Sequence, residues 1–503
     1  MKKFLMAICC FLTLGFILTG CATVGGIKNE NTELIYNGNA GVMVSDYLYY
    51  GNSYTDISSY TSMSELNTAK NVSYLARYNF NETRNAKGQN FTPIGNEKVN
   101  SEAIATDYQF MFVLGEYIYF LRPDQHRYGA DDGTSSYQFA YPVLTSSKLN
   151  GDKVNAFYTF EAEVSQIEVL KYEDNYYVVA LAGDRLVSIR LNNGGGSATV
   201  LAEGVTSAAI PETTRTSLKE QSSEWNGKIY YVATDEDSVT TINQINVNDA
   251  NSNQTILGKN NGTVTFLYRQ NDIIVYSNQN QYSQTIVYYN DVGKSTSRDD
   301  IILIDNAHSL QSSTATNIEI LNGTSTTIIF DGDAGKQFKN TRGGSGVITI
   351  NDSSSTDTAI SDYTTMFVND RLAYLITSTN IYEVDLTQVA QSARDGGDLT
   401  LTARTIVTMT KMVTSGELYS YDSGYIYYYA QLEELTDEEQ EKINQEKIDA
   451  GMEVDTSEDG EDTVITDTDA GCYLYRVRIN DGHYELIGTT NYEERHSDYV
   501  YKA

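Results

Sequence analysis

Short runs of apolar and aromatic residues, each preceded by a polar turn, recur along the chain. The runs are rich in Tyr, Ile and Val, which favour strands, and the Asp, Asn, Ser and Gly residues before them favour turns. The pattern therefore predicts an all-β protein. Clear copies are Tyr47-Leu48-Tyr49-Tyr50, Tyr117-Ile118-Tyr119-Phe120, Tyr176-Tyr177-Val178-Val179, Ile229-Tyr230-Tyr231-Val232, Leu372-Ala373-Tyr374-Leu375 and Tyr425-Ile426-Tyr427-Tyr428.

The copies recur at a spacing that indicates a repeat architecture. Many are followed by a second strand and a polar turn, as in Leu474–Ile479 with Asp481-Gly482. Repeats of about 40–50 residues with several strands each are typical of β-propellers. We therefore predict a β-propeller over residues 34–503, with about eight blades or alternatively seven. One marker residue from each copy is Leu48, Ile118, Tyr177, Ile229, Ile273, Ile328, Leu372 and Ile426.

The runs do not alternate between apolar and polar residues, which separates the propeller from its alternatives. A strand with one wet face alternates, whereas Ile229–Val232 is apolar or aromatic throughout. A β-sandwich would alternate more cleanly, and a β-solenoid would have shorter repeats. Tyrosine suits a strand packed on both faces, because its ring packs while its hydroxyl reaches a turn or water. The chain has 40 Tyr against 15 Phe.

The repeats resemble bacterial surface propellers with tandem IYY…LYRI…DG units, often lipoproteins of unassigned function. The resemblance covers about residues 34–501, and its motifs are loose. Near the end, Ser497–Tyr501 echoes Ser45–Tyr49. Pairing of these two segments in one blade would close the ring and remove a free sheet edge.

The N-terminus has the anatomy of an export signal. Lys2 and Lys3 precede an apolar run from Phe4 to Ile17, which is shorter than the roughly 20 residues of a membrane span. The sequence Leu18-Thr19-Gly20-Cys21 resembles a bacterial lipobox. That resemblance implies a signal peptide over residues 1–20, a lipid on Cys21 and a flexible tether over 21–33. We expect the protein to be anchored to the cell membrane and to face outside the cytoplasm.

One strongly acidic segment, residues 433–469, lies between the expected first and second strands of the last repeat. It holds 16 Asp or Glu and two Lys. Thr436–Glu439 fits a capping box and predicts a helix over 437–450. The following spacing resembles a calcium loop, but Thr466 stands where the bidentate Glu is expected. The alternative interpretations are a solvated insertion or a docking arm. The candidate calcium ligands are Asp455, Ser457, Asp459 and Glu461.

Composition excludes several classes of function. The net charge of −32 opposes binding to nucleic acid. If residues 1–20 are removed and Cys21 carries a lipid, only Cys472 is left, so no internal disulfide can form. No nucleophile elbow, phosphate loop or metal-ligand histidine spacing is present. The glycine-rich stretches 193–196 and 342–346 are interpreted as hairpin turns.

These features predict a membrane-anchored, extracytoplasmic binding or scaffold protein rather than an enzyme. Its partners would be the membrane, through the lipid, and an extracellular protein or glycan. No cofactor is expected other than calcium at the acidic loop. The alternatives are an assembly subunit of an envelope complex and, less favoured, an extracytoplasmic glycan-active enzyme, because a fold alone does not decide function.

Overall fold

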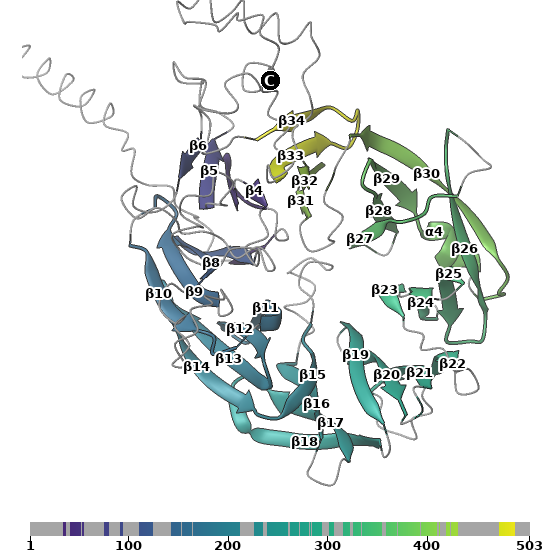
Figure 1. The fold of residues 1–503 in the computed structure, drawn as a ribbon, viewed down its shortest axis with the longest axis horizontal. Helices are drawn as coiled ribbons and strands as arrows, with labels where there is room; N and C mark the ends of the chain where they lie inside the picture. The colour runs from purple at the N-terminus through teal and green to yellow at the C-terminus, as the bar shows by residue number, and fades with distance from the viewer. Residues whose placement is uncertain are drawn as a thin grey trace, which may run out of the picture.

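The computed structural model arranges antiparallel sheets as blades around a ring (Figure 1). Within a blade the strands follow one another from the centre outwards, as β11 to β14 do. The structure describes residues 34–36, 41–51, 53–54, 75–79, 91–93, 110–123, 142–151, 153–162, 164–211, 226–234, 239–259, 262–270, 272–280, 282, 284–293, 301–305, 315–321, 325–332, 334–354, 359–369, 371–392, 394–409, 412, 419–422, 424–430 and 472–487.

The first four blades come from the N-terminal half of the chain. Blade 1 is β2 (Gly41–Val44), β3 (Tyr47–Gly51), β5 (Leu75–Asn79) and β6 (Phe91–Pro93). Blade 2 is β7 (Met111–Leu114), β8 (Tyr117–Pro123), β9 (Pro142–Lys148) and β10 (Asn155–Thr159), with β1 (Leu34–Ile35) beside β7. Blade 3 is β11 (Val164–Tyr172), β12 (Asn175–Ala182), β13 (Arg185–Asn192) and β14 (Gly195–Ala202). Blade 4 is β15 (Val205–Ala209), β16 (Lys228–Thr234), β17 (Thr240–Asn246) and β18 (Asp249–Lys259).

The remaining four blades continue in the same order. Blade 5 is β19 (Thr263–Gln270), β20 (Ile273–Gln279), β21 (Thr285–Asp291) and β22 (Ile301–Asp305). Blade 6 is β23 (Thr316–Leu321), β24 (Thr327–Gly332), β25 (Gly335–Asn340) and β26 (Ser345–Asp352). Blade 7 is β27 (Thr364–Asn369), β28 (Leu372–Ile376), β29 (Asn380–Asp385) and β30 (Leu399–Thr408), with the short helix α4 (Thr387–Ser392). Blade 8 is β31 (Ser420–Asp422), β32 (Tyr425–Ala430), β33 (Cys472–Arg478) and β34 (Tyr484–Leu486), with β4 (Ser53–Tyr54) beside β33.

The predicted β-propeller is confirmed, and the described strands form eight blades. All eight marker residues lie on the second strand of a blade. The interpretation of each run as the first strand of its unit was wrong. First strands such as β19 contain polar residues at several positions and are buried at only some of them, so they form no continuous apolar run. The first strands β2 and β7 are apolar, but each lies directly before the run that was taken as the start of its unit. Residues 433–469 therefore follow the second strand of blade 8.

The hydrophobic core is divided among the blade junctions rather than gathered in one place. Among the described residues there are eight buried clusters, and each joins two neighbouring blades. In β16, Ile229 and Tyr231 pack toward blade 3, whereas Tyr230 and Val232 pack toward blade 5. Side chains of a strand alternate between faces, so both faces must be apolar. This arrangement explains why the runs do not alternate.

Polar bonds from one blade to the turn after the third strand of the next reinforce these junctions. The Tyr49 hydroxyl donates to the Leu149 carbonyl oxygen at 2.7 Å. The Tyr119 hydroxyl donates to the Asn192 carbonyl oxygen at 3.0 Å and accepts from the Gly194 N–H at 3.1 Å. The predicted hairpin turn over 193–196 is confirmed, with Gly194 at a φ of 78°.

Blades 6 and 7 are joined in a different way. The second half of β26 leaves its own blade and pairs in parallel with β30, from Ile348 opposite Leu399 to Asp352 opposite Ala403. The two outer edges thereby cover each other, which removes exposed edge groups. The 342–346 turn, also confirmed, leads into β26.

The ring closes between blades 8 and 1. The Gly41 N–H donates to the Ser420 hydroxyl at 3.1 Å, and β4 pairs with the start of β33. A buried cluster that includes Tyr50, Tyr429 and Leu474 fills the junction. The predicted pairing of 45–49 with 497–501 involves residues outside the described ranges. In the described residues, each blade takes its four strands from one continuous stretch of chain.

Several predictions concern residues outside the described ranges and stay predictions. They are the signal peptide 1–20, the tether 21–33 with Cys21, the acidic insertion 433–469 with its helix, and the calcium ligands Asp455, Ser457, Asp459 and Glu461.

We expect Tyr119→Phe to lower the free energy of unfolding by about 1–3 kcal/mol, because it leaves the buried Gly194 N–H without its acceptor. Chemical denaturation would measure the change. Tyr117→Phe is the matched control, since no hydrogen bond of its hydroxyl is found in the described part of the chain, and it should change stability by less than about 0.5 kcal/mol. Equal losses in both variants would contradict the role of the Tyr119 hydroxyl.

Stability should also fall at alkaline pH. Burial raises the pKa of Tyr119 and of Tyr427 from 10.0 to about 12. A folded-state pKa above the unfolded value stabilises the protein fully below pH 10, and this contribution is lost between about pH 10 and 12. Each tyrosine accounts for up to about 3 kcal/mol. Burial lowers the pKa of Arg269 to about 10, and this shift raises stability as the pH increases above 10. Burial raises the pKa values of Tyr49 and Tyr50, so these two residues lower stability at alkaline pH as Tyr119 and Tyr427 do. Unchanged unfolding free energies at pH 8 and pH 11 would contradict this prediction.

Candidate functional site

Polar clusters outside the apolar junctions are the places where this propeller could carry chemistry. Within the described ranges no group of three or more His, Cys, Asp or Glu side chains could hold a metal ion. No helix in that part of the chain is long and apolar enough to span a membrane. Three clusters of charged residues stand out, at the junctions of blades 6 and 7, 4 and 5, and 7 and 8.

The cluster between blades 6 and 7 is a closed network around a buried lysine. Lys336 Nζ lies 2.7 Å from Asp331 Oδ1 and 3.3 Å from the Thr365 hydroxyl. Asp331 Oδ2 accepts from the Asn317 amide at 2.8 Å, and the ring of Tyr363 covers the ammonium group. Burial lowers the pKa of Lys336, and Asp331 opposes the shift. Because these groups satisfy each other, the cluster has the character of a structural ion pair.

The cluster between blades 4 and 5 is also internal. The Arg269 guanidinium lies 4.3 Å from the Tyr230 ring centroid and donates to the Ala209 carbonyl oxygen at 2.9 Å. The Tyr230 hydroxyl donates to Asp272 Oδ1 at 2.6 Å. Arg269 is only 3% exposed, so a ligand would reach it only if the junction opened.

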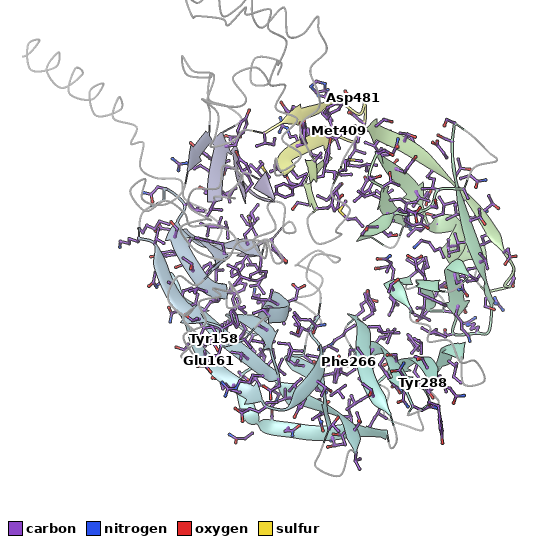
Figure 2. All side chains as sticks on the ribbon, in the orientation of Figure 1. Tyr158, Glu161, Phe266, Tyr288, Met409 and Asp481 are labelled. Atoms are coloured by element: carbon purple, nitrogen blue, oxygen red, sulfur yellow. The ribbon has the colours of Figure 1, made fainter. Side chains whose placement is uncertain are left out.

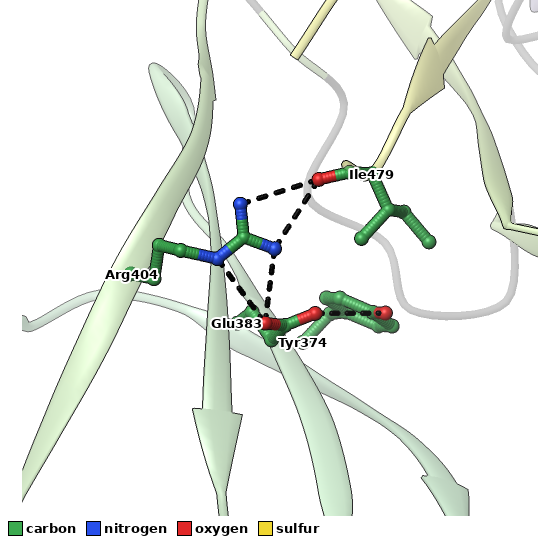
Figure 3. A network of polar contacts seen from close by, with 4 residues as sticks. All are labelled: Tyr374, Glu383, Arg404 and Ile479. Atoms are coloured by element: carbon green, nitrogen blue, oxygen red, sulfur yellow. Dashed lines mark hydrogen bonds and ion pairs between the residues drawn. The ribbon is translucent and has the colours of Figure 1, made fainter. Parts of the chain in front are cut away.

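The third cluster lies between blades 7 and 8 and reaches the surface. Figure 3 shows Arg404, on β30, bridging the two blades. Its guanidinium donates to Glu383 Oε1 at 3.0 and 3.2 Å and to the Ile479 carbonyl oxygen at 3.2 Å. Glu383 Oε2 accepts from the Tyr374 hydroxyl at 3.3 Å, and burial together with Glu383 raises the pKa of Tyr374. Arg404 therefore fixes the strand end at Ile479.

Directly after Ile479 the chain turns from β33 into β34 and forms a shallow hollow of about 450 Å³, here called the blade 8 hollow. Figure 2 places Asp481 at the outer edge of the ring. The hollow is lined by Arg478, Asp481, Gly482, His483 and Tyr484.

The lining residues are hydrogen-bonded to one another. Arg478 donates to both oxygens of Asp481, at 2.9 and 2.6 Å, and Asp481 Oδ1 also accepts from the His483 N–H at 3.2 Å. These bonds lower the pKa of Asp481, so its carboxylate is ionised at neutral pH. Two residues before Arg478 on β33, Arg476 forms an ion pair with Glu485. The hollow therefore presents charged groups whose charges are already matched.

Gly482 fixes how blade 8 meets blade 7. Its φ of 72° lies in the left-handed region, and a Cβ there would overlap the Ile406 carbonyl oxygen of blade 7. Only glycine meets both requirements without strain. The hollow is thus built on the junction that Arg404 reinforces.

The sequence pattern identified this segment only as a repeat unit. Leu474–Gly482 was the clearest LYRI…DG copy, and His483 was noted only as one of the histidines that lack a metal-ligand spacing. The alternation Arg476-x-Arg478, which puts both guanidinium groups on one strand face, was a usable signal that we did not interpret. Arg404 and Glu383 are distant in sequence and gave no signal. Cys472 lies on β33, and its side chain is outside the described set.

Comparisons with known proteins give similarities of fold only. Similar solved structures are oligopeptidase B from Leishmania major (TM-score 0.37, 9% identity, covering 75% of this chain and 48% of that chain) and an uncharacterized protein from Listeria monocytogenes (TM-score 0.32, 10% identity, covering 62% and 85%). Another is the β-propeller domain of the Trilobed protease from Pyrococcus furiosus (TM-score 0.34, 10% identity, covering 67% and 92%).

No family model and no curated protein matches the chain. The chain spans about half the length of oligopeptidase B. At these TM-scores the similarities carry no argument about activity, and the class of the protein, an eight-bladed β-propeller, is established by its strand topology.

We expect Gly482→Ala to lower the free energy of unfolding by about 2–4 kcal/mol, because it adds a steric overlap to the strain of a left-handed alanine. Gly115→Ala is the control: Gly115 has a φ of 62° but open space around the added atom, so about 1 kcal/mol is expected. Denaturation curves of both variants would measure the difference. A Gly482→Ala loss no larger than the control would show that the two blades do not meet as described.

Proposed function

We propose that the protein is a membrane-anchored, extracytoplasmic binding module that uses its propeller to hold a protein or glycan partner, without chemical turnover. The observation that carries this proposal is the blade 8 hollow, which is open and polar and is built from groups fixed by mutual ion pairs. Binding sites gain affinity when their polar groups are held in place before the ligand arrives.

The same ion pairs argue against catalysis at this place. A general acid or base needs a pKa near the working pH. The hydrogen bonds between Arg478 and Asp481 move both pKa values away from neutrality, because they lower the pKa of Asp481 and raise that of Arg478. Such a pair keeps its charges at physiological pH. It suits recognition better than proton transfer.

The proposed location of the protein at the membrane is based on its N-terminal sequence. The lipobox-like Leu18-Thr19-Gly20-Cys21 would place two or more acyl chains on Cys21, and two chains hold a protein stably at a membrane. The ring would then present its surfaces outside the cytoplasm on the tether 21–33.

Labelling with a clickable palmitate analogue tests the anchor. The wild-type chain should be labelled and sediment with membranes, and Cys21→Ser should be unlabelled and released. Cys472→Ser is the matched control and should behave as wild type. Labelling that survives in Cys21→Ser would overturn the anchor.

Cross-linking of cells that carry the tagged full chain tests the binding function. A reproducible protein or glycan should be recovered by mass spectrometry, and it should be lost in Arg478→Ala/Asp481→Ala. Recovery that does not depend on these residues would move the function to another surface. Hydrolysis of a glycan panel by the purified chain would overturn the absence of turnover.

A further inference from the structure

We propose that the blade 8 hollow binds a neutral, polyhydroxylated ligand, namely a sugar unit of an uncharged glycan. This inference rests on the proposed function, because it names the ligand class of the same binding module. Four features of the described residues support it: matched charge, fixed polar geometry, aromatic surface, and position in the ring.

The charge of the hollow is matched pair by pair. Arg478 is bound to Asp481 within the hollow, and each neighbouring arginine also has its own carboxylate: Arg404 has Glu383 and Arg476 has Glu485. A charged ligand would have to compete with one of these pairs for its partner. A neutral ligand leaves all three intact, so the protein's overall charge of −32 does not decide what binds at this place.

The polar groups are held at fixed positions beside one another. The bidentate pair orients the Arg478 plane, and Asp481 Oδ1 is further fixed by the His483 N–H. A guanidinium only donates hydrogen bonds and an ionised carboxylate only accepts them. A hydroxyl does both, so adjacent hydroxyl groups of a sugar can bond to the donor and the acceptor side by side.

Aromatic rings supply the apolar side that a sugar ring needs. Tyr484 lines the hollow. Its ring makes a tilted contact with the ring of Tyr475, with a centroid distance of 6.4 Å and an interplanar angle of 59°. The exposed His483 lies beside it. Aromatic side chains with one apolar surface and one polar tip suit ligands that are partly apolar and partly wet. The C–H face of a sugar is such a surface.

The position of the hollow favours a chain over a small enclosed molecule. It lies at the outer edge of the ring (Figure 2) and is open to solvent, with a volume of about 450 Å³. That volume is within the roughly 300–1,000 Å³ of ligand sites. A long glycan can pass across such an open site, with one unit seated in the hollow and the rest outside.

A glycan microarray probed with the tagged full chain in detergent tests the inference. The array carries neutral oligosaccharides of hexoses and N-acetylhexosamines beside oligosaccharides of uronic acids. Binding to at least one neutral series is expected, with weaker or no binding to the acidic series. Affinity for the best neutral hexasaccharide is then measured by microscale thermophoresis.

The variant Arg478→Ala/Asp481→Ala removes both charges together and leaves the net charge unchanged. We expect it to weaken neutral-glycan binding by at least tenfold. The matched control is Arg185→Ala/Glu161→Ala, another exposed ion pair, which joins blade 3 to the connection before it. The Arg185 side chain is 43% exposed, as is that of Arg478. It should change binding by less than twofold. His483→Ala removes only an exposed side chain; it should weaken binding about threefold or more and keeps the test open if the double variant does not fold.

The outcomes separate this inference from the proposed function. Preference for the acidic series, or binding that is equal in the hollow variants and the control, overturns the sugar site. Capture of a protein partner in cells without any neutral-glycan binding also overturns it but leaves the binding module standing. If the full chain binds no glycan and captures no partner in cells, both proposals fall.

Discussion

The whole structure depends on the burial of both faces of every blade against its neighbours. The described core consists of eight clusters, each shared by two blades, so no blade buries its apolar residues alone. A repeat that contacts only its neighbours is stable only as part of a series, and in a ring the series must also close. The cluster between blades 8 and 1, which contains Tyr50 and Tyr429, is therefore as necessary for stability as the other seven.

The same constraint places the polar groups. Two second-strand tyrosines that pack toward the next blade bond to it through their hydroxyls, Tyr49 at Leu149 and Tyr230 at Asp272. At the junction of blades 7 and 8, Arg404 makes the corresponding bond, to the Ile479 carbonyl oxygen. Its ion pair with Glu383 lies at the surface. The blade 8 hollow therefore lies beside a junction that Arg404 reinforces, and we propose that its polar residues bind the partner.

The fold could be predicted from the sequence because its controlling residues are local. Leu48, Ile229 and the other markers identify second strands, because each of those strands carries an apolar and aromatic run directly after a turn. First strands such as Thr263–Gln270 were not recognised because polar residues interrupt them. The apolar first strands Gly41–Val44 and Met111–Leu114 are short and were not separated from the runs that follow them. The candidate site was not predicted for a different reason. Arg404 and Ile479 come together only when blades 7 and 8 pack against each other, and no spacing in the sequence indicates that contact. The composition predicts that the protein does not bind nucleic acid, but it held no signal for a matched ion pair.

The central claim is that this propeller recognises its partner on blade 8, and hydrogen–deuterium exchange of the full chain tests it most directly. Exchange would be compared in the free chain and in the complex purified from cross-linked cells. The account predicts that protection on binding is concentrated in residues 472–487, with unchanged exchange in the β11–β14 blade on another part of the ring. Protection confined to other blades, with 472–487 exchanging as in the free chain, would contradict it.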